Sequence, residues 1–174
     1  MTAPRWSRRA SFAWVVAGYS AALASASVAL LFVPEGLGSF WTVAIADLVA
    51  TFVIFALSRG LKCSSMYDAY WSVAPVFIVF YWVFHAEEAV NPVRAGAVLV
   101  LVTWWGIRLT YNWARSWPGL HHSDWRYEIM EEKAPRLWFF SDLFGIHLFP
   151  TVEVLFALSG AWVALTQGSA PLSW

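Results

Sequence analysis

Five long apolar stretches, separated by short polar segments, organise this sequence. The apolar stretches cover approximately residues 11–33, 40–57, 69–84, 95–114 and 137–167. A helix of about 20 mainly apolar residues is long enough to cross the ~30 Å hydrocarbon core of a bilayer. A helix also satisfies its own backbone hydrogen bonds there. The pattern therefore predicts an all-α fold: a polytopic membrane helical bundle of about five transmembrane helices, forming one membrane domain over residues 1–174.

The last apolar stretch, 137–167, is too long for one straight span of about 20 residues. Two interpretations are open. Either an interfacial segment runs up to Phe149 and a span follows over 151–167, or one long helix is kinked at Pro150. Proline removes a backbone donor and crowds the preceding turn, which makes either boundary plausible.

Four ionisable residues interrupt the apolar stretches without an obvious role: Asp47, Asp142, His147 and Glu153. Charged groups inside a span are costly and usually face a protein interior or a wet cavity. In one continuous α-helix Asp142 and Glu153 would share a face, whereas His147 would point about 140° away from Asp142. We expect Asp142, His147 and Glu153 to mark a polar interior surface. We interpret Asp47 as a neutral acid bonded to a neighbouring helix, with a functional role as the alternative.

Composition supports the membrane assignment. The chain is 60% hydrophobic and only 13% charged, whereas a soluble domain carries roughly 25% charged residues. The formal net charge is zero, which argues against nucleic-acid binding.

The single cysteine, Cys63, excludes an internal disulfide and a cysteine-based metal site. His121 and His122 are adjacent and would diverge on a helix, so we expect no metal site.

Positive charges alternate between the predicted loops. Three arginines precede the first apolar stretch, none lies in the first loop, and Arg59 and Lys62 lie in the second. Cytoplasmic loops carry the excess of lysine and arginine, so we expect a cytoplasmic N-terminus in a multi-pass protein of the cell inner membrane. The first apolar stretch exceeds the 7–15 residues of the apolar h-region of a signal peptide. We interpret it as a retained helix, with a signal peptide cleaved near Ala26 as the alternative.

The stretch that follows Ala95 carries the clearest candidate chemistry. Arg108, Asn112 and Arg115 recur at helical spacing and form a polar stripe on one face. At ~1.5 Å per residue, Arg108 lies inside the last third of the span and Arg115 near its exit. We interpret Arg108 as the buried end of a cationic wall that meets an anionic group. The alternative is an arginine that snorkels to the interface.

Four segments together resemble a known family: CSSMYDAYWSVAP, LVTWWGIRLTYNWARSW, HSDWRYEIMEEK and GIHLFPT. In order and spacing they are similar to the DUF1295 family, membrane proteins related to steroid 5-alpha-reductases and sterol C14-reductases. The resemblance runs from about Cys63 to Thr166. The family-motif residues present here are Ser65, Asp68 and Trp71 in the first segment, Trp105, Gly106 and Arg108 in the second, and Asp124, Arg126 and Tyr127 in the third.

The resemblance implies an NADPH-dependent reductase that adds hydride across a carbon–carbon double bond conjugated to a carbonyl in a lipid. It implies membrane lipids as surroundings and a lipid or sterol-like substrate. The cofactor would lie in a cavity that faces the cytoplasm, where arginine's planar fork suits phosphate. The cofactor-binding residues that the resemblance implies are Arg108, Asn112, Arg115, Asp124, Arg126 and Tyr127.

One departure from the family pattern affects this expectation. Full family members continue into a Glu-x-x-Ala-Asp helix and an Arg-His-Pro-Asn-Tyr loop, and neither motif occurs here. We therefore expect the front part of a reductase, completed by a C-terminal half or another membrane subunit. Two alternatives remain: a non-catalytic bundle for lipid binding or assembly, and a membrane methyltransferase-like relative that uses S-adenosylmethionine.

Overall fold

The computed structural model describes residues 6–86 and 90–166, and its regular elements are helices throughout these ranges. Five helical runs among the described residues are long and apolar enough to cross a membrane. They are Arg8–Leu30, Ser39–Leu61, Ser64–Phe84, Pro92–Ser116 and Trp138–Ala157. The predicted all-α bundle of about five membrane-spanning helices is confirmed.

The elements follow one another as α1 (Arg8–Leu30), α2 (Ser39–Leu61), the 3-10 helix η1 (Ser64–Tyr67), α3 (Tyr70–Phe84), α4 (Pro92–Ser116), α5 (Trp125–Lys133), α6 (Trp138–Phe140), the π-helix η2 (Ser141–Leu148), α7 (Phe149–Ala157) and α8 (Ser159–Thr166). Local sequence explains several boundaries. The Ser7 side chain caps α1, and Asn91 caps α4 just before Pro92. Lys62 ends α2 in the left-handed conformation, with φ of 55°.

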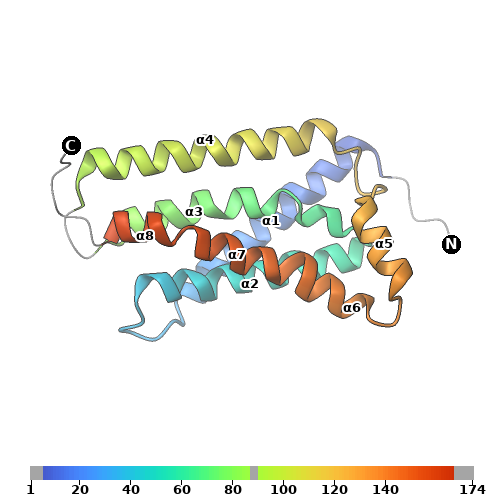
Figure 1. Ribbon diagram of the computed structural model, residues 1–174, viewed down its shortest axis with the longest axis horizontal. Helices are drawn as coiled ribbons and strands as arrows, with labels where there is room; N and C mark the ends of the chain where they lie inside the picture. The colour runs from blue at the N-terminus through green and yellow to red at the C-terminus, as the bar shows by residue number, and fades with distance from the viewer. Residues whose placement is uncertain (1–5, 87–89, 167–174) are drawn as a thin grey trace.

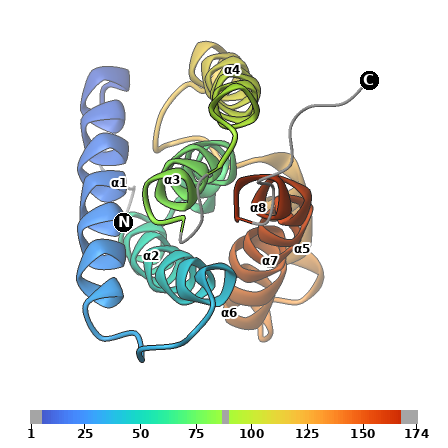
Figure 2. The same ribbon diagram turned by 90° about the vertical axis from the view of Figure 1, so that its left-hand side faces the viewer.

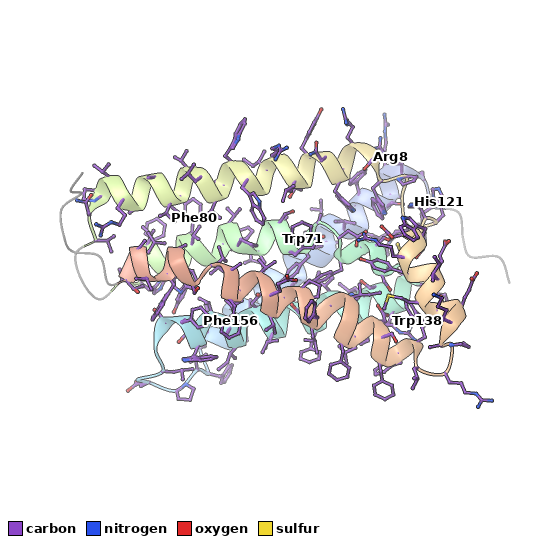
Figure 3. All side chains as sticks on the ribbon, in the orientation of Figure 1. Arg8, Trp71, Phe80, His121, Trp138 and Phe156 are labelled. Atoms are coloured by element: carbon purple, nitrogen blue, oxygen red, sulfur yellow. The ribbon has the colours of Figure 1, made fainter. Side chains whose placement is uncertain are left out.

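The long helices run roughly side by side, and α2 and α3 lie between α1, α4 and the α6–α8 segment (Figures 1 and 2). Short α5 lies across one end of the bundle, close to the first turn of α1, the end of α4 and the start of α6 (Figure 1). We call this the α5 end. Arg8 lies there beside the last turn of α4 (Figure 3), and its guanidinium donates to the carbonyl oxygens of Ala114 and Trp117.

The last membrane-length run is helical across Phe149 and Pro150, as the interpretation of one long helix requires, but its geometry is not α throughout. No break follows Phe149, because helical structure continues from Trp138 to Ala157. The run is not a uniform α-helix either, since η2 has the wider π geometry and the Phe149 N–H bonds to the Phe144 carbonyl five residues back. Pro150 lies in the first turn of α7, and the run ends at Ala157, before α8 begins at Ser159.

The π geometry also changes which polar residues meet. In a π-helix each residue lies above the one five positions before it in the sequence. His147 therefore contacts Asp142, with Nδ1 3.0 Å from the Asp142 carbonyl oxygen and 3.3 Å from Oδ1. The expectation that the two would point about 140° apart is wrong. The expected shared face of Asp142 and Glu153 is also wrong, because Asp142 is fully buried and Glu153 is exposed.

Candidate functional site

The first and third family-motif segments meet at the α5 end. Ser65 Oγ accepts a hydrogen bond from the Asp124 N–H at 2.8 Å. The Tyr127 hydroxyl donates to Asp68 Oδ1 at 2.6 Å. These two contacts fasten α5 to the turn between η1 and α3, so the spacing of residues within each segment is needed to bring the four groups together. We call these four residues the motif junction.

Asp124 begins α5 and holds Arg126. Its side chain caps the helix by accepting from the Arg126 N–H at 2.9 Å. Its two oxygens also accept from the Arg126 guanidinium at 2.8 and 2.9 Å. The hydrogen bond to the guanidinium is the main cause that lowers the pKa of Asp124 from its ordinary value. The Arg126 guanidinium is therefore already engaged by a carboxylate of its own helix.

The second motif segment packs α4 against α3. Trp105 and Trp71 meet edge to face, with ring centroids 6.1 Å apart. A Cβ added to Gly106 would lie 2.6 Å from the Ser72 carbonyl oxygen, so only glycine permits this close approach. Beside it, the Ser72 and Thr110 hydroxyls are 2.9 Å apart. Trp105 and Gly106 thus have a packing role in this structure.

The polar stripe of α4 faces outward. Arg108, Asn112 and Arg115 all have exposed side chains, so the expectation that Arg108 is buried is wrong. The reason is helical geometry: Gly106 lies on the face that contacts α3, and Arg108 is two residues further, about 200° around the helix. Among the described residues, the six expected cofactor-binding residues therefore divide into an outward stripe and a set near α5. No hydrogen bond or ion pair of the described residues joins the side chains of the stripe to those of the set near α5.

A large apolar groove lies between α1 and α3, with α2 at its floor and the end of α4 at its side. Its volume is about 550 Å³, within the ~300–1,000 Å³ typical of small-molecule sites. Figure 2 shows α1 standing to one side of α3 and α4. Most of the lining is aliphatic or aromatic, and representative residues are Val15, Leu23, Val43, Val73, Phe77 and Trp113.

Two polar side chains of the groove wall are bonded to each other. The Tyr70 hydroxyl donates to Asp47 Oδ1 at 2.7 Å, and both residues line the groove. Both are buried, with Asp47 7% exposed and Tyr70 6%. Asp47 was expected to bond to a neighbouring helix, and it does so, whereas Tyr70 was not identified as its partner. The sequence contained one indication of a polar partner for Asp47. Tyr67 and Tyr70 are three residues apart, so their hydroxyl groups share a helical face at the start of the third span.

A second buried polar cluster lies behind this pair. Thr151 Oγ1 is 2.7 Å from the Tyr67 hydroxyl and 2.8 Å from Thr51 Oγ1, and it donates to the His147 carbonyl oxygen. The three residues are each at most 3% exposed. They come from α2, η1 and α7, and Thr151 is 100 residues from Thr51 and 84 from Tyr67 in sequence. No periodic pattern in any one helix could have predicted that they meet.

Cys63 does not add a nucleophile to the site. Burial raises the pKa of its thiol to about 11, so the sulfur is protonated at neutral pH. The thiol donates a weak hydrogen bond to the His122 carbonyl oxygen at 3.4 Å. Cys63 therefore serves as a small packing residue between α2 and the segment before α5.

We expect Tyr127→Phe to destabilise the protein by about 1–3 kcal/mol, because the partly buried Asp68 carboxylate would lose its hydroxyl donor. The measurement is the free energy of unfolding in bicelles. Tyr111→Phe is the matched control, since Tyr111 is 64% exposed on α4 and its loss should change little. Equal stability of the Tyr127→Phe variant and the wild type would contradict a fastening role for the motif junction.

Comparison with known proteins places these observations in a family. Residues 54–174 match the family model described as "Protein of unknown function (DUF1295)". No curated protein and no solved structure matches the chain. The match covers well over half of the chain and includes all three segments that interlock α3, α4 and α5. The chain therefore belongs to the DUF1295 family.

Proposed function

We propose that this protein is the lipid-binding part of a membrane-embedded, NADPH-dependent reductase of the steroid 5-alpha-reductase-like type. The substrate would be a lipid or sterol-like molecule whose carbon–carbon double bond is conjugated to a carbonyl. The observation that carries the proposal is the Tyr70–Asp47 hydrogen bond in the wall of the apolar groove. An apolar site with a few convergent polar groups is the usual form of a small-molecule site.

The groove supplies the two features that such a substrate needs. Its apolar walls suit a hydrocarbon skeleton that enters from the membrane. Tyr70 supplies a hydroxyl that can donate to a carbonyl oxygen and so withdraw electrons from the conjugated double bond. A hydroxyl carries one proton, so Tyr70 can donate to the carbonyl only when Asp47 is protonated and donates to Tyr70 in turn. Asp47 would thus orient the hydroxyl and support its acidity.

The described residues do not fit NADPH by themselves. Arg126 is engaged by Asp124, Tyr127 is engaged by Asp68, and the Arg108 stripe points outward from α4. When bound, the cofactor would supply a hydride. Its binding would need groups in addition to these residues, such as a C-terminal half or another membrane subunit that covers the Arg108 stripe. We propose the α5 end as the cytoplasmic side, where that partner and the cofactor would meet.

The second candidate function is non-catalytic: a bundle that holds a lipid or assembles with other membrane proteins. The separation of the six expected cofactor-binding residues favours it, whereas the Tyr70–Asp47 pair favours the reductase. A methyltransferase-like relative is distinguished by its nucleotide, S-adenosylmethionine.

Nucleotide binding by the membrane-embedded protein tests the proposal. We expect NADPH to bind to the protein in nanodiscs together with its membrane partners, as measured by titration of NADPH fluorescence. Arg108→Ala should weaken binding by roughly 10- to 100-fold, the value of a charged contact of about 1.5–3 kcal/mol. Arg136→Ala is the control, because Arg136 is an exposed arginine outside the helical spans.

The other outcomes separate the candidates. Unchanged affinity in a folded Arg108→Ala variant would remove Arg108 from the cofactor site. Absence of NADPH binding by the wild type, with a bound lipid retained in the groove, would support the non-catalytic function. Displacement of NADPH by S-adenosylmethionine would support the methyltransferase-like alternative.

A further inference from the structure

We propose that the groove binds a single-chain lipid whose enone lies within the chain rather than at one end. The polar end group of this lipid would lie at the end of the groove remote from α5, its carbonyl at Tyr70, and its apolar tail in a closed arm at the α5 end. The inference rests on the proposed function for the enone, and it narrows the substrate from a lipid or sterol-like molecule to a linear chain. The fit of the chain can be tested without NADPH or turnover.

The groove is long and narrow. On α1 its lining extends from Phe12 to Leu30, and on the side of α3 it extends from Ala69 to His85. At ~1.5 Å per residue the α1 wall is about 27 Å long, close to the ~30 Å thickness of the hydrocarbon core. A volume of about 550 Å³ spread over this length gives a mean cross-section of about 20 Å². That cross-section matches one extended hydrocarbon chain and is too small for a flat fused-ring skeleton.

The rings of Tyr19 and Tyr70 narrow the groove near its middle. Both residues line the groove, and their rings meet edge to face with centroids 5.8 Å apart. The Tyr19 hydroxyl donates to the Met66 carbonyl oxygen at 2.8 Å, which holds the Tyr19 ring in place. Measured along α1, Tyr19 lies about 10 Å from Phe12 and about 16 Å from Leu30. A lipid carbonyl at Tyr70 therefore has groove on both sides of it.

The shorter part of the groove, between Tyr19 and Phe12, is closed at the α5 end, and we call it the closed arm. The Phe12 ring meets the Trp113 ring edge to face, with centroids 5.8 Å apart. Arg8 of α1 donates to the Ala114 carbonyl oxygen of α4 at 2.6 Å. The last two turns of α4 thus add a third wall to this arm. An apolar tail can enter the closed arm but cannot continue past Phe12.

The longer part of the groove, between Tyr19 and Leu30, ends among polar side chains. Ser27, Tyr81 and His85 line the groove there. His85 is exposed, and its ring stacks on the Tyr81 ring with centroids 4.1 Å apart. These polar groups suit the polar end group of a lipid, whereas the closed arm suits its apolar tail. The two ends of the groove therefore give the lipid one direction.

Blocking the closed arm and shortening the lipid tail tests the inference. The probes are two linear fatty acids with an enone inside the chain, identical except that one has a shorter tail beyond the carbonyl. Binding to the full chain in nanodiscs is followed by infrared spectroscopy of the ¹³C-labelled carbonyl, whose stretching frequency falls when a hydroxyl donates to it. We expect Tyr70→Phe to abolish this shift for both probes.

Val16→Trp is the blocking variant. Val16 lines the closed arm and is 63% exposed, so the larger ring can be accommodated without unfolding α1. We expect it to weaken binding of the long-tailed probe by at least about ten-fold, because several buried CH₂ groups leave the arm. The affinity for the short-tailed probe should change by less than about two-fold. Val28→Trp is the control, since Val28 is 54% exposed on the same helix and lies outside the groove.

Each outcome decides the inference. Recovery of binding with the shorter tail supports it, and Ala114→Leu, which fills the same arm from α4, should give the same pattern if Val16→Trp fails to fold. Equal effects on the two probes would overturn the closed arm as the site of the tail. Tighter binding of a ¹³C-labelled steroid enone than of the long-tailed probe would overturn the single chain and leave the proposed reductase standing. A bound chain that NADPH does not reduce, with the membrane partners present, would overturn the proposed function alone.

Discussion

Tyr70→Phe is expected to lower the rate of lipid reduction by about 10²- to 10⁴-fold, the usual contribution of a positioned proton donor. The substitution removes one oxygen and leaves the ring in the wall of the groove. The affinity for the lipid should change far less, because the apolar contacts remain. The measurement is NADPH consumption with a lipid enone, in nanodiscs that contain the protein and its membrane partners.

Tyr81→Phe is the matched control for this experiment. Tyr81 also lines the groove, on α3, and it lies about three helical turns from Tyr70. Its hydroxyl is therefore far from the Asp47 pair, and its loss should leave turnover nearly unchanged. Equal turnover of Tyr70→Phe and the wild type would show that the Tyr70–Asp47 pair is not the proton donor.

Gly106→Ala is expected to produce the largest loss of stability among single small substitutions in α4. The new Cβ would lie 2.6 Å from the Ser72 carbonyl oxygen and 2.8 Å from Val76 Cγ2. Backbone cannot move aside as a flexible side chain can, so α3 and α4 must separate. We expect a cost of about 1–3 kcal/mol from this overpacking, measured as the free energy of unfolding in bicelles.

Gly96→Ala provides the comparison on the same helix. A Cβ at Gly96 meets nothing within 4 Å, so alanine should be neutral or should stabilise α4 by up to about 1 kcal/mol. A similar effect of the two substitutions would mean that α3 and α4 are not in close contact at Gly106. A destabilised Gly106→Ala beside a stable Gly96→Ala would confirm the packing role of the second motif segment.

The fold was largely predictable because it depends on a local property. The length of an apolar stretch determines whether a helix can cross the bilayer, and each stretch can be measured without its neighbours. The contacts of Ser65 with Asp124 and of Asp68 with Tyr127 were partly predictable, since the family resemblance groups the segments. The roles of the individual side chains could not be predicted. Hydrogen bonds at the α5 end engage Arg126 and Tyr127, which could otherwise contact a cofactor.

The remaining errors concern the direction in which side chains point. Arg108 was expected to be buried because its depth in the span was estimated without knowing which face of α4 packs on α3. Gly106 determines that face, and its contact with Ser72 depends on another helix. The Tyr70–Asp47 pair was missed for the same reason: the need of Asp47 for a partner was visible, whereas the identity of the partner depends on how α2 and α3 are placed.

Because of the π-helix η2, the direction of the side chains that follow it depends more on the number of residues in 141–148 than on their types. A π turn holds more residues than an α turn, and one residue more or fewer turns everything that follows by about 100°. The wider turn absorbs an extra residue, so loss of one residue from 141–148 with a return to α geometry would leave Thr151 facing nearly the same way. A return to α geometry without that loss would turn Thr151 away from Thr51 and Tyr67, although all three side chains would remain in the sequence. Two relatives could therefore share every polar residue of this region and still differ in structure. An alignment of such a π segment with an α segment needs a one-residue gap here to equate faces that point in the same direction.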